Sequence, residues 1–148
     1  MDKLTENFTL EELYQSPTAC RWKIDNTPSE EVIEHLKELC EKILQPLRDV
    51  MNRVSINSGY RCEALNKKVK GSNTSQHVFG NAVDIKTVDM KAAFIYIMEN
   101  LPFDQLIWEY GDDNQPAWIH VSYSDRNRRE VLRKKTRGGY KPFKIKTK

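Results

Sequence analysis

The chain has 148 residues, of which 39% are hydrophobic and 30% charged, so it is long enough for one globular domain (1–148) with a buried core. No apolar run approaches the roughly 18 residues of a membrane-spanning helix, and the N-terminus lacks the basic and apolar regions of a signal peptide. We therefore expect a protein without a transmembrane segment that is synthesised in the cytoplasm and needs outside help for any export.

The three cysteines do not point to a disulfide framework. Cys20, Cys40 and Cys62 are odd in number and show no CxxC spacing, which argues against paired disulfides and against a cysteine-based zinc site. We expect reduced thiols that are mostly buried.

Positive charge is concentrated at the C-terminal end. Residues 124–148 hold eleven Lys and Arg against two acidic residues, although the net charge of the whole chain is only +3. A basic segment of this kind is often simply solvated, but it also suits contact with an anionic cell-wall or membrane surface. Nucleic-acid binding is disfavoured, because the segment lacks interleaved aromatic residues and a recognisable motif.

Capping patterns and apolar spacing predict helices in the first third of the chain. Thr9 is the predicted cap of a short helix, with Glu12 at the third helical position of a capping box. The stretch 27–30 (Thr-Pro-Ser-Glu) repeats this pattern, so Thr27 is the predicted cap of a second helix that has proline at its first position. Behind it, apolar residues recur at steps of three and four over residues 32–51, which predicts one long helix.

Three residues of the long helix carry separate expectations. Pro46 is expected to kink the helix or divide it. Cys40 lies on the apolar stripe and is therefore expected in the core rather than as a reactive thiol. His35 lies on the polar side and is expected to be solvated.

The rest of the chain is richer in strands. The predicted elements are a strand at 54–57, a turn at 58–61, a helix at 62–69 ended by Gly71, a strand at 82–85, a helix at 90–100 capped by Asp89, and strands at 104–110 and 117–123. Residues 130–134 and 140–145 flank an Arg-Gly-Gly turn and suggest a hairpin. Because helices come first and strands cluster later, we expect an α+β fold with helices on one face of an antiparallel sheet.

Two histidines and an aspartate are spaced as a metal site requires. His77 and Asp84 are seven residues apart with Gly80 between them, and His120 lies in the later strand. Strand alternation places Asp84 and His120 opposite the branched aliphatic residues of their strands, on the face away from the core. A hydrolytic zinc site needs three protein ligands and one open position, so His77, Asp84 and His120 are the predicted zinc ligands.

Three more residues are candidates for chemistry beside the metal. Glu109 is the best candidate general base, because it closes its strand pointing away from the core-facing residues and precedes His120 by a hairpin-sized loop. Arg61 offers a fork of donors for a substrate carboxylate or a developing oxyanion. Ser75 either orients the substrate or bonds the loop backbone, and the sequence leaves both roles open.

The run from Ser75 to Asp84 (Ser-x-His-x-x-Gly-x-Ala-x-Asp), with Ser-Gly-Tyr-Arg at 58–61 and Trp-x-His at 118–120, resembles the M15 zinc peptidases. The similarity covers nearly the whole chain and is greatest to the subgroup related to D-alanyl-D-alanine carboxypeptidases and phage-type peptidoglycan endopeptidases. It implies that His77, Asp84 and His120 bind zinc and that Arg61 contacts substrate. It also implies the small α+β fold shared with the hedgehog signalling domain, and cleavage of bonds involving D-amino acids in bacterial cell-wall peptides.

One position departs from the family pattern. Several members place a catalytic glutamate three residues before the last histidine, where this chain has Ala117. The role of base then passes to Glu109, or else to Asp112 or Asp113. A non-catalytic module that binds peptidoglycan or a protein on the same zinc fold is the alternative to an enzyme.

The resemblance and the missing signal peptide together suggest where the protein acts. We expect a monomer that acts on bacterial peptidoglycan, and the N-terminus favours a phage-type lysin that reaches the wall through a membrane lesion. The choice between carboxypeptidase and endopeptidase, the bond that is cut, and a phage or bacterial origin stay open.

Overall fold

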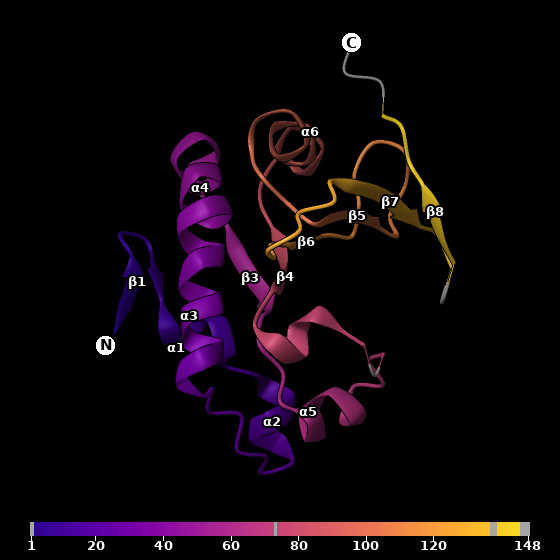
Figure 1. Ribbon diagram of the computed structural model, residues 1–148. Helices are drawn as coiled ribbons and strands as arrows, with labels where there is room; N and C mark the ends of the chain where they lie inside the picture. Colours follow the sequence, from indigo (N-terminus) through magenta and orange to yellow (C-terminus); the bar gives the residue numbers. More distant parts are fainter. Residues whose placement is uncertain (1, 73, 137–138, 146–148) are drawn as a thin grey trace.

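A mixed six-stranded sheet, covered on one face by the longer helices, forms the body of the molecule in the computed structural model (Figure 1). The structure describes residues 2–72, 74–136 and 139–145. The α+β fold class predicted from the sequence is confirmed. Within the described residues, no helix has the length and apolar character that crossing a bilayer requires.

The predicted N-terminal capping box is confirmed. Thr9 caps α1 (Leu10–Tyr14), and the Thr9 side chain and the Glu12 backbone and side chain form the reciprocal bonds of the box. Ser16 then caps a second short helix, α2 (Pro17–Arg21), which the sequence reading did not predict. The chain enters α1 from a small two-stranded ribbon, β1 (Lys3–Thr5) and β2 (Phe8–Thr9).

The long helix is continuous but begins later than predicted (Figure 1). It comprises α3 (Glu30–Leu39), a π-helical stretch η1 (Cys40–Leu44) and α4 (Gln45–Met51). The predicted cap Thr27 is wrong: Ser29 accepts the hydrogen bond from the Val32 amide, while the Thr27 amide donates to the Asp25 side chain. Pro46 is the second residue after the wider π turn, and this turn accommodates a residue that has no amide hydrogen to donate.

The thiols differ in their surroundings. Cys40 is fully buried in the core, as expected, and burial raises its pKa to about 12. Cys62 is half-buried, but Cys20 is exposed, so the expectation of mostly buried cysteines is wrong for Cys20.

The sheet has the strand order β3-β4-β6-β5-β7-β8 and is antiparallel except at one pair. Its strands and the helices between them are β3 (Ser55–Ser58), α5 (Glu63–Lys68), the 3-10 helix η2 (Gln76–Phe79), β4 (Ala82–Lys86), α6 (Met90–Asn100), β5 (Gln105–Glu109), β6 (Trp118–Ser122), β7 (Glu130–Lys134) and β8 (Tyr140–Pro142). The segments predicted to form a C-terminal hairpin pair antiparallel as β7 and β8, with the second strand shorter than expected, and the predicted turn at 137–138 lies outside the described residues.

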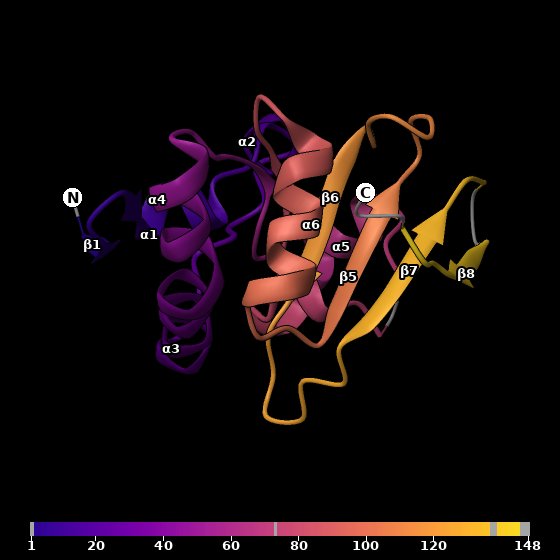
Figure 2. The ribbon, with the colours of Figure 1, turned by 90° about the horizontal axis from the view of Figure 1, so that it is seen from above.

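The parallel pair β5 and β7 departs from the purely antiparallel sheet that was predicted. After β6 the chain returns to the beginning of β5, where the Arg129 amide donates to the Phe103 carbonyl and the Glu130 amide donates to the Asp104 carbonyl. Because β7 starts beside the start of β5, the two strands must run in the same direction. Figure 2 shows β7 beside β5, with α6 lying across the sheet.

Strand alternation divides the sheet into an apolar face and a polar face. The residues that pack toward the helices are fully buried, and they include Val83, Ile85, Leu106, Trp108, Ile119 and Val121. Phe94 of α6 meets Trp108 edge to face, with ring centroids 5.3 Å apart. Asp84, Glu109 and His120 alternate with these residues and therefore project from the opposite face.

Asp104, just before β5, links three separate segments of the chain. Its fully buried carboxylate accepts two hydrogen bonds from the Arg128 guanidinium, at 2.9 and 3.0 Å, and one from the Arg128 amide at 2.9 Å. It also accepts one at 2.8 Å from Nε2 of Gln76, in η2. The bonds from Arg128 hold the pKa of Asp104 well below its usual range.

Asp104→Asn should lower the free energy of unfolding at pH 7 by roughly 2 kcal/mol, because charge-assisted hydrogen bonds are lost. Since the pKa is depressed in the folded state, this stabilisation is complete above about pH 5 and is lost as the pH falls through the folded-state value. Urea unfolding at pH 6 and pH 3 should therefore show a smaller loss of stability in the variant than in the wild type. Asp125→Asn, at an exposed position, is the matched control, and equal pH dependence in Asp104→Asn and wild type would contradict the role of Asp104.

Candidate metal centre

The helix η2 fixes His77. Ser75 caps η2 by accepting the hydrogen bond of the His77 amide, and Gly80 ends it with a left-handed φ of 76°. A Cβ on Gly80 would lie 2.9 Å from Cγ1 of Val32, so the glycine also lets η2 approach α3 closely. The ring of buried His77 donates from Nδ1 to the Gly59 carbonyl at 2.8 Å, and this bond leaves the lone pair of Nε2 for a metal ion.

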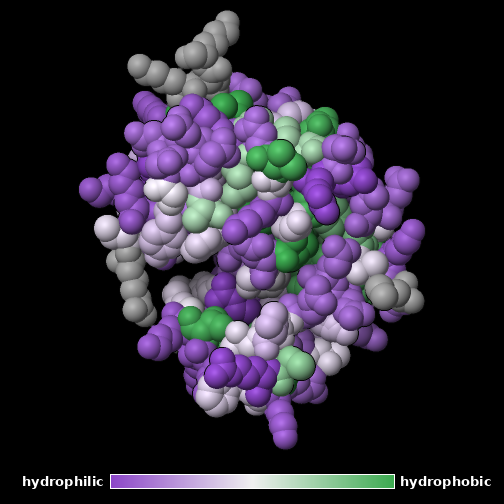
Figure 3. All heavy atoms as spheres, turned by 180° about the vertical axis from the view of Figure 1, so that it is seen from behind, coloured by the Kyte–Doolittle hydropathy of each residue, from purple (hydrophilic) through white to green (hydrophobic). Residues whose placement is uncertain are grey.

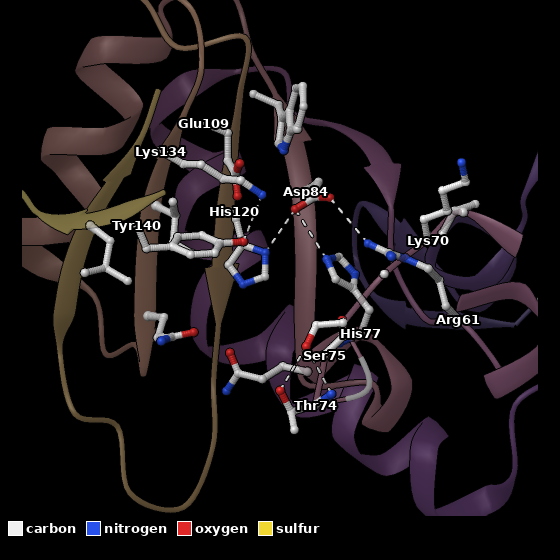
Figure 4. Close-up of a pocket in the computed structure, with 18 of the residues that line it drawn as sticks. Arg61, Lys70, Thr74, Ser75, His77, Asp84, Glu109, His120, Lys134 and Tyr140 are labelled. Carbon is white, nitrogen blue, oxygen red and sulfur yellow. Dashed lines mark hydrogen bonds and ion pairs between the residues drawn. The ribbon is translucent and has the colours of Figure 1, made fainter. Parts of the chain in front are cut away.

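The three predicted ligands converge (Figure 4). Asp84 and His120 are direct partners on neighbouring strands, and Asp84 Oδ1 lies 3.1 Å from Nδ1 of His120 and 3.4 Å from Nε2 of His77. All three ligand atoms lie within 4.8 Å of one another. Ligands of a tetrahedral zinc ion are about 3.3 Å apart, so the group could hold zinc.

The charge of Asp84 suits a metal ligand. Burial alone would favour the neutral acid, but the neighbouring imidazoles of His77 and His120 offset it and hold the pKa of Asp84 far below its usual range. Asp84 is therefore a carboxylate at neutral pH, as metal coordination requires.

The three residues lie on the wall of a cleft of about 710 Å³. The lining comes from the polar face of the sheet, from the segment before His77 and from the β7–β8 hairpin. Figure 3 shows this hollow on the side of the molecule opposite to the view of Figure 1. The candidate metal centre is thus accessible to a ligand of peptide size.

Glu109 shares the cleft with the metal ligands, whereas Asp112 and Asp113 do not line it. The Glu109 side chain is only 5% exposed, and this burial raises its pKa. Asp112 instead accepts the backbone hydrogen bonds of its own loop, from the amides of residues 114 and 115, and Asp113 pairs with Arg133 at 2.7 Å.

Arg61 reaches the same group from the other side. Its Nε donates to Ser58 at 3.3 Å, its Nη1 donates to Asn66 at 3.2 Å, and its Nη2 lies 3.9 Å from Asp84 Oδ2. A Cβ on Gly71 would overlap Asn66 and crowd the guanidinium, so this glycine makes room for the pair. The left-handed residue after α5 is Lys70 rather than Gly71, whose amide bonds the Asn66 carbonyl.

Two residues that position the site were missed in the sequence. His35 is partly exposed, and its Nδ1 donates to the Phe79 carbonyl at 2.7 Å, so it also ties η2 to α3. Asn26 is buried and bonds the backbone of Tyr14, Tyr60 and Cys62, fixing the turn that carries Arg61. Neither residue belongs to a pattern along the chain, because each acts on a segment more than 30 residues away.

His35→Ala should weaken the affinity for a divalent metal ion about 10-fold, since groups that orient a ligand from behind typically contribute this much or more. His35→Asn is the matched variant, because its amide nitrogen can donate in place of Nδ1, and it should restore most of the affinity. Competition with a chromophoric chelator measures both. An unchanged affinity in His35→Ala would show that η2 does not need this bond to present His77.

The fold and the site agree with one comparison with known proteins. The model of the Peptidase M15 family matches residues 6–122, well over half of the chain. The matched part includes the three candidate ligands, Arg61 and Glu109, but neither β7 nor β8. A comparison with curated proteins gives no match. On the family match, the chain belongs to the Peptidase M15 family of metal-dependent peptidases.

Proposed function

We propose that the protein is a zinc-dependent metallopeptidase that hydrolyses peptide bonds of bacterial peptidoglycan, in the stem peptide or the cross-bridge. The observation that carries the proposal is the convergence of His77, Asp84 and His120 in one cleft with Glu109 and Arg61, in a chain that belongs to a peptidase family. The peptidoglycan substrate rests on the resemblance of the motif set to cell-wall peptidases.

The ligand atoms available for zinc are Nε2 of His77, Oδ1 of Asp84 and Nδ1 of His120. When bound, zinc acts as a Lewis acid that activates water and polarises the scissile carbonyl. Every other role in the reaction falls to the cleft residues.

Glu109 is the proposed general base and acid. Its buried carboxylate has a raised pKa, which suits a group that accepts a proton from the attacking water and later delivers it to the leaving amine. Ala117, where several family members carry a glutamate, adjoins Glu109, because the Ala117 amide donates to the Glu109 carbonyl at 2.8 Å. A carboxylate on β5 thus stands beside the position where other family members carry theirs.

Arg61 and Ser75 are the proposed substrate-binding residues. The Arg61 guanidinium, held by Ser58 and Asn66, can donate to a substrate carboxylate or to the developing oxyanion. The Ser75 hydroxyl lines the cleft while it accepts from the His77 amide, so its own hydrogen remains to donate to the substrate. Both roles proposed for Ser75 from the sequence are then compatible.

The shape of the cleft favours endopeptidase action. A second cavity of about 290 Å³ adjoins the first, since Arg61 and Val69 line both. A substrate can therefore continue past Arg61 instead of ending there, as the last residue of a carboxypeptidase substrate would. We infer that the cleft accepts peptide on both sides of the scissile bond.

Access to the wall and attraction to it are part of the proposal. The basic segment 124–148 suits an anionic cell-wall or membrane surface, where it would hold the enzyme near its substrate. We propose that the protein acts on the wall as a monomer after phage-type release.

Protein purified without added metal should hold about one zinc ion per chain, and His120→Ala and Asp84→Ala should lose most of it, because each removes one of three ligands. Asp112→Asn, outside the cleft, should keep the wild-type content. Elemental analysis of dialysed protein gives the stoichiometry. A wild type that holds no zinc and gains no activity when zinc is added would refute the proposal that the protein is a metallopeptidase.

Glu109→Gln should keep zinc but lower kcat by about 100-fold to 10,000-fold, the range typical of a lost general base. The assay is release of peptides from purified peptidoglycan, with muropeptides identified by mass spectrometry and a chelator as the blank. Asp112→Asn and Asp113→Asn are isosteric controls and should stay active. Wild-type turnover in Glu109→Gln would show that another residue is the base. A zinc-loaded wild type that binds peptidoglycan without releasing peptides would show that the protein is a non-catalytic binding module.

A further inference from the structure

The β7–β8 hairpin forms a wall of the metal cleft, although it lies outside the residues that match the family. The strand register puts Glu109 of β5, Lys134 of β7 and Tyr140 of β8 in one row across the sheet. Neighbouring strands present partner residues on the same face, so the row continues the polar face that carries Asp84 and His120. Lys134 and Tyr140 line the cleft together with these residues.

Lys134 and Tyr140 act as a pair. Nζ of Lys134 donates to the Tyr140 hydroxyl at 3.2 Å and lies 4.7 Å from the centre of its ring. Because the phenol oxygen accepts this bond, its own hydrogen remains free to donate into the cleft. Within the part of the chain that the structure describes, no carboxylate lies within ion-pair distance of Lys134. Glu109, the strand partner of Lys134, is its anionic neighbour, and the pair still offers an ammonium and a hydroxyl to the cleft.

The pair and Arg61 lie on opposite sides of the His-Asp-His group (Figure 4). The charged residues of the cleft are Arg61, Lys70 and Lys134 against Asp84 and Glu109. Once Asp84 serves as a metal ligand, positive charge exceeds negative charge in the cleft as a whole, with Arg61 and Lys70 on one side and Lys134 beside Glu109 on the other. Such a cleft favours an anionic substrate, and the Arg61 guanidinium and the Lys134–Tyr140 pair offer hydrogen-bond donors to it at two separate points.

We propose that Lys134 and Tyr140 form a carboxylate-binding subsite, and that the substrate is a peptide with acidic groups on both sides of the scissile bond. The inference rests on the proposed function and adds the substrate class. One carboxylate is bound by Arg61, and the other accepts hydrogen bonds from the Tyr140 hydroxyl and the Lys134 ammonium. Lys134 stands between Glu109 and Tyr140 in the row, so it separates the bound carboxylate from the general base.

The test uses a peptide with a carboxylate on each side of the scissile bond, and two versions in which one or the other is a carboxamide. Wild type should bind the acidic peptide about 10-fold to 100-fold more tightly than either version, the range for hydrogen bonds to a charged group. Lys134→Met and Tyr140→Phe should abolish the preference for one of the two carboxylates and leave the other preference intact. Lys134→Arg should retain both preferences, since it keeps the charge and the donors.

Lys141→Met is the matched control, because Lys141 lies on the same hairpin and is exposed. Its strand partner is Arg133, one residue along from the Lys134–Tyr140 pair and therefore on the opposite face. It removes the same charge without changing the cleft, so both preferences should persist. KM for each peptide, and calorimetric titration of the zinc-loaded protein with the corresponding product peptides, give independent readings.

Two outcomes separate the subsite from the proposed function. Hydrolysis by wild type with the same carboxylate preferences in Lys134→Met would overturn the subsite and leave the peptidase intact. No hydrolysis of any peptide would count against the peptidase, and calorimetry would still decide the subsite. Equal binding of acidic and amidated product peptides by wild type would overturn the proposed subsite.

Discussion

Asp84 and His120 stand directly opposite each other on β4 and β6, and the geometry of the candidate metal centre depends on this pairing. The backbone ladder between two antiparallel strands holds partner side chains about 5 Å apart at their Cβ atoms. The ladder thus places two ligand atoms 3.1 Å apart without any contribution from a loop. Only His77 has to be positioned separately, and η2 does this. The His77 ring donates to the Gly59 carbonyl, and the Phe79 carbonyl of η2 accepts a hydrogen bond from His35.

The register between β4 and β6 determines both which residues fill the core and which face the candidate site. Val83 and Ile119 fill the core because they alternate with Asp84 and His120, which face the cleft. A slip of one residue in either strand would bury a ligand and expose an aliphatic side chain, so burial of the apolar face also keeps the ligands in place. Asp104 adds a second link, because its carboxylate ties η2 to the start of β5 and to the segment before β7.

Local patterns in the sequence were enough to predict the caps of α1 and α6, the alternation in β4 and β6, and the grouping of His77, Asp84 and His120. They failed where two local patterns overlap or where the deciding partner is distant. Thr27 and Ser29 both precede helix-compatible residues, and only the folded chain shows that Ser29 takes the cap. The parallel pairing of β5 with β7 depends on the path of the chain after β6, which no periodicity records. The hydrogen bond of His35 was not predicted because its partner, the Phe79 carbonyl, is 44 residues away.

The candidate general base lies at the end of β5, next to the residue that precedes β6. The Ala117 amide donates to the Glu109 carbonyl, and the Glu109 side chain lines the cleft. Glu109 is buried there, beside His120, and its raised pKa follows from that burial. The same row of the sheet runs on to Lys134 and Tyr140, beyond the residues that the family shares. In the proposed enzyme, the residues for the chemistry lie on strands inside the family match, whereas the proposed substrate subsite lies on a hairpin outside it.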